Sequence, residues 1–121
     1  MSFELSQAFY FEASHTLHRE IDATGSRRIH GHTYHAEVTL SGPVDARTGM
    51  LVDLGHVRHA IAAVRDKLDH HLLDDVDGIG PATLENLCSF ILRHVSAEVQ
   101  GVCAVTVERR ASGDKCVLRV D

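Results

Sequence analysis

The chain has little of several residue types, and each shortage narrows the classes of protein to which it can belong. It contains no tryptophan, and only 5% of its 121 residues are aromatic. Its three cysteines are an odd number and include no Cys-x-x-Cys pair that would indicate a structural zinc site. This pattern predicts free thiols in a reducing compartment, the cytoplasm.

An excess of positive charge and a long apolar run are also missing. The formal net charge is -5, so nothing in the composition favours a nucleic-acid or membrane surface. No apolar stretch approaches membrane-spanning length, and residues 1–5 lack the basic region and apolar run of a secretory signal. The length and the 44% hydrophobic content predict one domain, residues 1–121, with its own core.

Alternating apolar and polar residues predict two strands in the first third of the chain. One face of residues 3–15 carries Phe3, Leu5, Phe9, Phe11, Ala13 and His15. Residues 30–41 alternate in the same way, and Gly42 and Pro43 end that strand. The polar segment 16–29 between them is expected to be a loop.

Two amphipathic helices and a hairpin are predicted in the remainder. Asp53 and Thr83 are expected helix N-caps. The apolar stripes that follow them are Leu54, Val57, Ile61, Val64 and Leu68, and then Leu84, Leu87, Ile91, Val95 and Val99. Gly101 is expected to close the second helix. Residues 103–110 and 115–120 are predicted to form a terminal β-hairpin.

The resulting order, ββααββ, predicts an α+β architecture. Two helices on one face of a four-stranded antiparallel sheet form two packed layers. Such a sheet keeps open edges and one poorly covered face, and proteins usually pair or cover edges of this kind. Association of subunits that continues the sheet is therefore expected.

Three histidines form the first candidate site. His30 and His32 are separated by one residue of a predicted strand, so their side chains point to the same face. If the two strands pair antiparallel, His15 meets them at one end of the sheet. Three neutral imidazoles and one free position are the ligand set of catalytic zinc. Ordinary strand histidines are the alternative, and His18 and His35 are spare imidazoles, with His35 expected on the opposite face.

Two further positions can carry acid–base or binding chemistry. Asp69 precedes His70 and His71 at the predicted end of the first helix, where a carboxylate can orient an imidazole in a proton relay. Solvated histidines that favour the helix C-terminal dipole are the simpler interpretation of these residues alone. Glu108 interrupts an apolar strand. It is either a residue of the solvent-exposed face of the sheet, or a carboxylate that accepts two hydrogen bonds from the guanidine-like edge of a ligand.

Six short segments occur in a specific order. They are FEASH ending at His15, HGHTY from His30, GMLVDL from Gly49, LDH from Leu68, PATLEN from Pro81, and the strand that ends at Glu108. Together they resemble the 6-pyruvoyl-tetrahydropterin synthase / 6-carboxy-tetrahydropterin synthase family. The resemblance implies the tunnelling fold (T-fold), in which the sheets of three subunits join into a barrel, two trimers commonly stack as a hexamer, and the active sites lie between subunits.

The resemblance also implies a reaction and a set of roles. His15, His30 and His32 match the Zn²⁺ ligands, Asp69 and His70 the catalytic relay, and Glu108 the carboxylate that anchors the pterin ring. The implied activity of bacterial members is that of a zinc-dependent lyase. It converts 7,8-dihydroneopterin triphosphate to 6-carboxy-5,6,7,8-tetrahydropterin and releases acetaldehyde and triphosphate, a step towards queuosine.

Ser26 departs from the family pattern, which has a cysteine at this position as the general base. A serine hydroxyl is a far poorer base than a thiolate. Candidate bases are therefore Ser26 activated by Asp69 and His70, a loop group (His18, Glu20 or Asp22), or Cys116, for which an ordinary strand residue is the simpler interpretation. Arg27 and Arg28 suit a triphosphate tail, with solvated loop arginines as the commoner alternative. A related lyase with another product, or a pterin- or zinc-binding module, is the alternative function.

Overall fold

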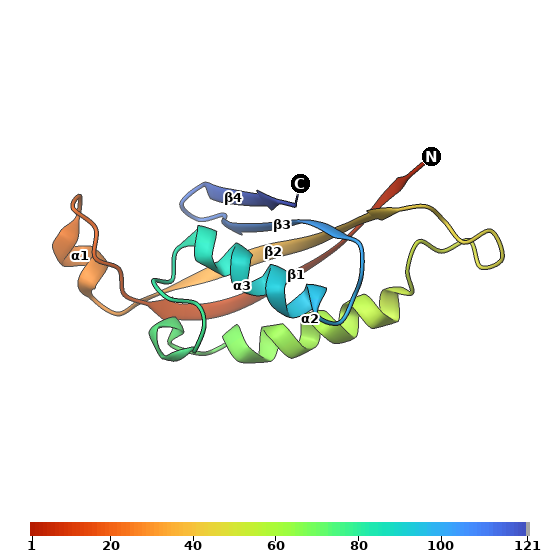
Figure 1. Cartoon of the computed structure of the whole chain (residues 1–121). Coiled ribbons are helices and arrows are strands. Elements are labelled where there is room, and N and C mark those ends of the chain that lie inside the picture. Colours follow the sequence, from red (N-terminus) through yellow and green to blue (C-terminus); the bar gives the residue numbers. More distant parts are fainter. Residues whose placement is uncertain (121) are drawn as a thin grey trace.

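The computed structural model describes residues 1–120 as a four-stranded antiparallel sheet with helices on one face (Figure 1). The strands are β1 (Phe3–His15), β2 (His30–Gly42), β3 (Val102–Arg109) and β4 (Asp114–Arg119), and they lie in the order β1-β2-β3-β4. The two strands predicted from alternation and the two strands of the predicted terminal hairpin are all confirmed. Because every connection joins neighbours, the sheet is a simple antiparallel meander.

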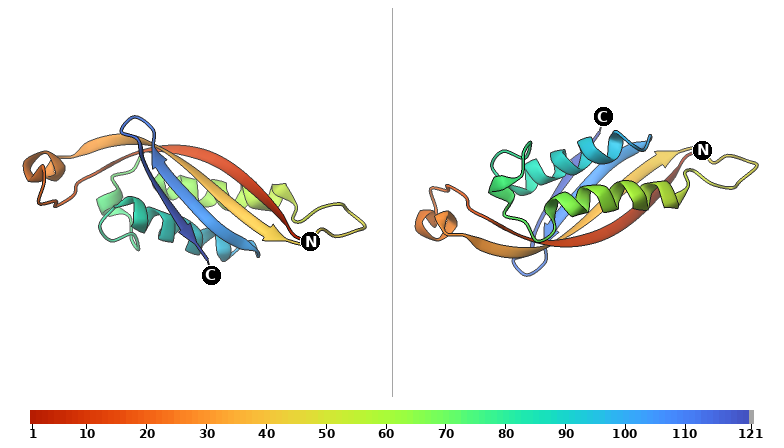
Figure 2. Two further views of the ribbon diagram at one scale, coloured as in Figure 1. Left: turned by 90° about the horizontal axis from the view of Figure 1, so that it is seen from above. Right: turned by 90° about the horizontal axis from the view of Figure 1, so that it is seen from below.

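Helices α2 (Leu54–Leu68) and α3 (Leu84–Ser96) cover one face of the sheet, and Figure 2 shows the other face without a helix. The predicted stripes point to the sheet: Val57 and Leu68 of α2 and Leu87 and Ile91 of α3 are fully or almost fully buried. They pack with the inward residues of the strands, among them Phe11, Tyr34, Val38, Val105 and Val107. The core therefore lies between the helices and one sheet face.

Both predicted N-caps are confirmed, whereas the predicted end of the second helix is wrong. The Asp53 carboxylate accepts a hydrogen bond from Gly55 N at 2.8 Å, and the Thr83 hydroxyl accepts one from Asn86 N at 3.1 Å. Helix α3 ends at Ser96, and a turn follows in which Val99 still reaches the core. Gly101, with φ +90°, reverses the chain into β3 instead of closing the helix.

The segment predicted as a loop between the first two strands contains a short helix, α1 (Ala23–Arg27). Five residues are too few to show an amphipathic period, so alternation and periodicity could not reveal it. A second short element, η1 (Leu73–Asp75), follows α2. Figure 1 shows α1 projecting beyond β3 and β4 at the far end of the β1–β2 ribbon.

The segment that follows α2 covers the outer edge of β1 near the C-terminal end of that strand, at residues 12–14. His70 N donates to Glu12 O at 2.6 Å, and Ser14 N donates to His71 O at 3.1 Å. The Asp69 carboxylate accepts from Glu12 N at 2.9 Å. These bonds satisfy backbone groups that an edge strand otherwise leaves open, and they fix Asp69 and His70 against the sheet.

Replacing Gly101 by alanine is expected to destabilise the fold more than the same change at Gly49. Both glycines have positive φ, +90° and +73°, but a Cβ at Gly101 would lie 3.3 Å from Ser41 O, whereas a Cβ at Gly49 meets nothing within 4 Å. We expect G49A to lower the free energy of unfolding by about 1 kcal/mol and G101A by about twice as much, measured by urea denaturation. Equal losses would contradict the close approach at Gly101.

Candidate active site

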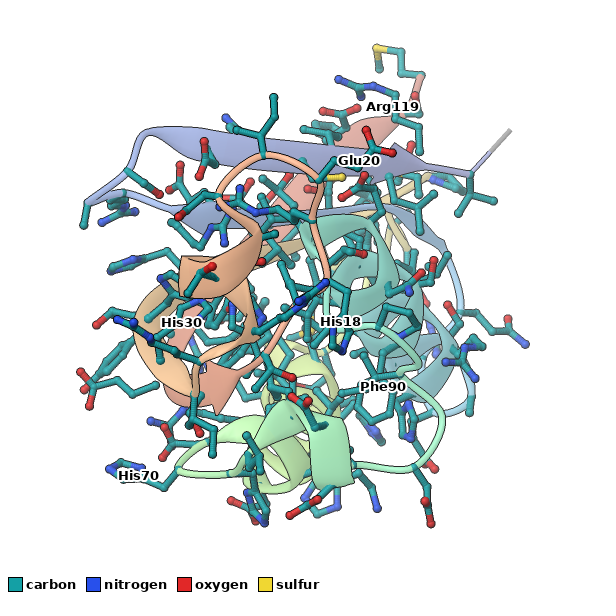
Figure 3. All side chains as sticks on the ribbon, turned by 90° about the vertical axis from the view of Figure 1, so that its left-hand side faces the viewer. His18, Glu20, His30, His70, Phe90 and Arg119 are labelled. Carbon is teal, nitrogen blue, oxygen red and sulfur yellow. The ribbon has the colours of Figure 1, made fainter. Side chains whose placement is uncertain are left out.

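The three predicted histidines meet at the end of the β1–β2 ribbon. His15 and His30 are opposite one another in the antiparallel register, and His32 lies two residues along the same face. The Nε2 atoms of His15 and His30 are 3.0 Å apart, and those of His15 and His32 are 3.1 Å apart. Figure 3 looks onto this end of the molecule and labels His30. The potential ligand atoms all lie within 4.8 Å of one another, which is close enough to share one metal ion.

Backbone carbonyls hold two of the three rings in a metal-binding orientation. His15 Nδ1 lies 2.9 Å from Ala82 O, and His30 Nδ1 lies 2.7 Å from Arg28 O. A carbonyl only accepts, so each Nδ1 carries the proton and each Nε2 presents a lone pair. Two lone pairs 3.0 Å apart repel each other unless a cation lies between them. Tetrahedral zinc separates its nitrogen ligands by about 3.3 Å, so the donors fit such an ion.

Burial favours the neutral form of the imidazoles. His15 is 1% exposed, and burial lowers its pKa below the usual value, with the Ala82 carbonyl opposing and the neighbouring His30 adding to this effect. Burial also lowers the pKa of His32 to about 4, helped by His15 and by the Arg109 guanidinium. Because only a neutral imidazole binds metal, both rings are ready to ligate at neutral pH.

A cavity of about 180 Å³ lies on the sheet face that carries His30 and His32; we call this face the metal face and the cavity the metal cavity. Its lining comprises Leu17, Arg19, Ser26, His30, His32, Arg109, Ser112 and Asp114. The Ser26 side chain is 3% exposed; its hydroxyl donates to Ala23 O at 3.1 Å and accepts from Arg19 N at 3.3 Å. These bonds fix the loop around α1 and occupy the only proton of that hydroxyl.

Asp69 and His70 form the predicted acid–imidazole pair. Asp69 Oδ2 lies 2.9 Å from His70 Nδ1 and 3.4 Å from an Arg65 nitrogen. The Glu12 N–H, and then His70, hold the pKa of the Asp69 carboxyl below its usual range. The His70 side chain is 76% exposed, so its Nε2 is free to exchange a proton. The pair is therefore oriented for proton transfer towards solvent or towards a bound molecule.

Neither partner of this pair bonds to Ser26 among residues 1–120. His70 lines a cavity of about 460 Å³ whose lining includes Glu12, Gly31, Thr33 and the ligand candidate His32, but not Ser26. The structure thus does not bring Ser26 together with Asp69 and His70 as the sequence hypothesis of an activated serine requires.

Glu108 lies on the face of the sheet away from the histidine ligands. Tyr10, His35, Glu108 and Lys115 form a row across the four strands. Side chains alternate along a strand, so His35 faces away from His32, as predicted, and Glu108 shares its face. The four line a hollow of about 310 Å³. Within one chain the sheet therefore separates Glu108 from the metal ligands.

Among residues 1–120, the Glu108 carboxylate has one hydrogen-bonded side-chain partner, Arg110. Arg110 Nε lies 2.9 Å from Glu108 Oε1, and this hydrogen bond holds the pKa of Glu108 below its usual range, so the group is anionic at neutral pH. An ionised carboxylate is the form that can accept two hydrogen bonds from a guanidine-like edge.

The remaining candidates are scattered. Arg27 and Arg28 are exposed near the metal cavity, and Arg28 contributes its carbonyl to His30. Asp22 pairs with Arg19 at 3.5 Å. In Figure 3, Glu20 and His70 lie on opposite sides of the view, with His30 between them, and His18 lies nearer the middle.

Cys116 lies on β4 and packs against the core, as the simpler interpretation predicted. Its carbonyl accepts a hydrogen bond from Cys88 Sγ at 3.6 Å. All three cysteines have free thiols. Cys116 therefore serves as a strand residue in this chain, away from the lining of the metal cavity.

Sequence reasoning missed Arg109 and Tyr34, which lie on the metal face. Tyr34 is fully buried beneath the histidines, with ring centroids 5.6 Å from His32 and 6.4 Å from His15. Burial raises the pKa of Tyr34 to about 12, against the opposing effect of the neighbouring Arg109. Strand alternation could have found Arg109, because the residue after Glu108 must point to the opposite face.

Comparisons with known proteins agree with this fold. The family model described as 6-pyruvoyl tetrahydropterin synthase matches residues 4–119. A *Caenorhabditis elegans* 6-pyruvoyl tetrahydropterin synthase structure has a TM-score of 0.87 at 23% identity, covering 100% of this chain and 97% of that one. The *Plasmodium vivax* enzyme gives 0.80 at 17% identity, covering 100% and 99%. These neighbours confirm the T-fold subunit, the class of protein to which the sheet and its helices belong.

Curated relatives carry two related names. A putative 6-pyruvoyl tetrahydrobiopterin synthase of *Caenorhabditis elegans* is 32% identical over 114 residues, 81% of either chain. A 6-carboxy-5,6,7,8-tetrahydropterin synthase of *Synechocystis* sp. is 32% identical over 106 residues, 82% of this chain and 80% of that one. The chain belongs to the 6-pyruvoyl tetrahydropterin synthase family, a family of lyase enzymes.

Other relatives match over a shorter stretch. The *Drosophila melanogaster* 6-pyruvoyl tetrahydrobiopterin synthase is 39% identical over 75 residues, 59% of this chain. The chain spans about half the length of this relative and of the Aquifex aeolicus 6-carboxy-5,6,7,8-tetrahydropterin synthase, 45% and 56% respectively.

In residues 1–120, no helix combines the length and the apolar character that a membrane span requires.

Acidification is expected to destabilise the metal-free protein between about pH 6.5 and pH 4. His32 has a pKa of about 4 when folded and 6.5 as the unperturbed value, so the unfolded chain takes up a proton first as the pH falls. The contribution of His32 to stability is therefore lost from about pH 6.5 downward and stays constant below about pH 4, where the carboxylates with lowered pKa values, such as Asp69 and Glu108, account for further loss. We expect urea denaturation of H32N to show a shallower decline, while H59N, at an exposed site on α2, keeps the wild-type slope. Equal slopes for H32N and the wild type would contradict the pKa shift.

Proposed function

We propose that the protein is a zinc-dependent lyase that converts 7,8-dihydroneopterin triphosphate to 6-carboxy-5,6,7,8-tetrahydropterin and releases acetaldehyde and triphosphate, in the cytoplasmic route to queuosine. The convergence of three Nε2 atoms, with two Nδ1 protons held by carbonyls, carries this proposal. Family membership supplies the pterin class of substrate.

Each part of the site has a distinct proposed role. His15, His30 and His32 would hold Zn²⁺, which supplies stabilisation of negative charge on the substrate's side-chain oxygens. Glu108 accepts two hydrogen bonds from the guanidine-like edge of the pterin ring. His70, held by Asp69, gives or takes a proton at its exposed Nε2. Arg27 and Arg28 face solvent where a triphosphate tail can extend.

The site is complete only if subunits combine. Glu108 lines a hollow on the helix-free face of the sheet, whereas His30 and His32 line the small cavity on the other face. A substrate that touches both sets must therefore lie between two chains. We propose a homo-oligomer in which sheets join into a trimeric barrel and two trimers stack as a hexamer, which also covers the helix-free sheet face.

The position of the general base supports a second candidate function. The hydroxyl of Ser26, at the position of the family cysteine, already donates to Ala23 O and lies apart from the relay pair. A lyase with another base and another product, such as a hydroxymethyl pterin, is the alternative. In the *Plasmodium vivax* structures a glutamate is described as a catalytic residue. Here Glu20, in the loop before α1, is a candidate carboxylate.

Product analysis tests the proposal. Purified, zinc-loaded protein is incubated with 7,8-dihydroneopterin triphosphate, and the aldehyde and the pterin are identified together. Acetaldehyde with the 6-carboxy product supports the proposed lyase. A glycolaldehyde-type product with a hydroxymethyl pterin supports the alternative reaction, and pterin binding without turnover supports a binding module.

Replacing His30 by alanine is expected to remove the metal. Loss of one of three protein ligands leaves a two-nitrogen site, so zinc per chain should fall from about one to below about 0.1 after dialysis, measured by elemental analysis. H59A, at an exposed position on α2, is the matched control and should keep its zinc. Stoichiometric zinc in H30A would exclude the ligand assignment.

Replacing Glu108 by glutamine should weaken pterin binding and leave the metal in place. The variant loses a charge-assisted pair of hydrogen bonds, so the Kd for neopterin should rise about 10- to 100-fold in calorimetry. E98Q, at an exposed residue beyond α3, is the control for removal of a carboxylate charge. Unchanged affinity in E108Q would remove its anchoring role.

A further inference from the structure

We propose that Arg109 binds the phosphorylated end of the substrate's side chain beside the metal and so makes the site selective for pterins that carry a phosphate. This inference rests on the proposed function and names a specificity-determining residue for it. The evidence is the placement of Arg109, the way its guanidinium is held, and the position of the ring anchor on the other face.

The placement follows from the strand. Arg109 is the last residue of β3 and follows Glu108, so the two side chains leave the sheet on opposite faces. Glu108 lines the hollow on the helix-free face, whereas Arg109 lines the small cavity with Ser26, His30 and His32. Arg109 is thus a fixed cation on the same face of the same chain as the metal ligands.

The Arg109 guanidinium is held in place by an ion pair with Asp114. Its NH2 group lies 2.9 Å from Asp114 Oδ2, and Asp114 also accepts from the Ser112 hydroxyl at 2.8 Å. Arg109 and Asp114 are opposite one another in the β3–β4 register, so the hairpin turn sets the position of the ion pair. The Arg109 side chain is only 20% exposed. It is therefore pre-oriented, and little side-chain freedom is lost when it binds a ligand.

Much of its donor capacity stays unused. The guanidinium has five N–H donors, and its buried Nε has no hydrogen-bond partner among residues 1–120. The neighbouring Tyr34 hydroxyl, in a fully buried residue, also lacks one. The Arg109 guanidinium and the Tyr34 hydroxyl nevertheless adjoin and interact with each other, so the donors left for a ligand are the other N–H groups of the guanidinium, whose side chain lines the metal cavity.

The chemistry of the ligand follows from the division between the two faces. The carboxylate that suits the pterin ring lies on the helix-free face, and the cavity of about 180 Å³ lies on the other. The part of a substrate that enters the metal cavity is therefore its side chain. The anionic group of that side chain is phosphate, for which the fork of an arginine is the preferred partner.

Two ligand classes and a free anion test this assignment. Zinc-loaded wild type, R109M and R119M are titrated calorimetrically with inorganic triphosphate, with neopterin and with neopterin triphosphate. Arg119 is exposed on β4 and lies outside the metal cavity, so R119M controls for the loss of one positive charge. R109K keeps the charge but not the planar fork, and zinc content and unfolding midpoint show that each variant is folded.

We expect wild type and R119M to bind neopterin triphosphate more tightly than neopterin. In R109M this preference should fall about tenfold or more, with neopterin affinity unchanged, and R109K should recover only part of it. Affinity for inorganic triphosphate should fall in parallel. If R109M does not fold, the same comparison is made with R109K, whose loss of preference then decides.

Failure of the Arg109 assignment and failure of the proposed pterin function give different results. A preference for neopterin triphosphate that persists in both folded Arg109 variants, or is lost only in an R27M/R28M variant, overturns the role of Arg109 and leaves the lyase proposal standing. Wild type that binds no triphosphate also overturns it. Wild type that binds triphosphate through Arg109 but binds no neopterin supports an anion site at Arg109 and overturns the pterin function instead.

Discussion

The antiparallel register of β1 and β2 is the constraint on which the rest of the structure depends. It places His15 opposite His30, and the two-residue repeat brings His32 to the same face. A shift of β2 by one residue would turn His30 and His32 to the helix-free face, away from His15, and would expose Tyr34, which is now fully buried. The hydrophobic core therefore fixes the register, and the register assembles the metal ligands. Stability and chemistry come from the same alternation.

Much of this arrangement could be predicted from the sequence because it depends on local periods. The strands, the caps at Asp53 and Thr83, and the meeting of the histidines follow from alternation and helix signals. The adjacency of Asp69 and His70 follows from their neighbouring positions, although their attachment to Glu12 on β1 does not. The end of α3 could not be predicted, because the chain must turn into β3 before its apolar period runs out.

What periodicity missed depends on contacts between segments far apart in the chain. The carbonyls of Ala82 and Arg28 orient His15 and His30, and no side-chain pattern indicates such a role for a backbone group. The hydrogen bonds of the Ser26 hydroxyl depend on a helix of five residues that leaves no amphipathic trace. Arg109 gains its importance only when the β3–β4 hairpin is seen beside the histidines. These features need three-dimensional proximity, which one sequence does not encode in a readable way.

The use of carbonyl groups behind the metal ligands has an evolutionary consequence. In many metal sites a carboxylate side chain orients the histidine, and its loss by one point mutation disturbs the metal. Here the orienting groups belong to the peptide backbone at residues 28 and 82, and every amino acid supplies the same oxygen. The side chains at these two positions therefore have no part in orienting the metal ligands. They can drift, or acquire tasks in substrate recognition, while the ligand geometry is inherited unchanged.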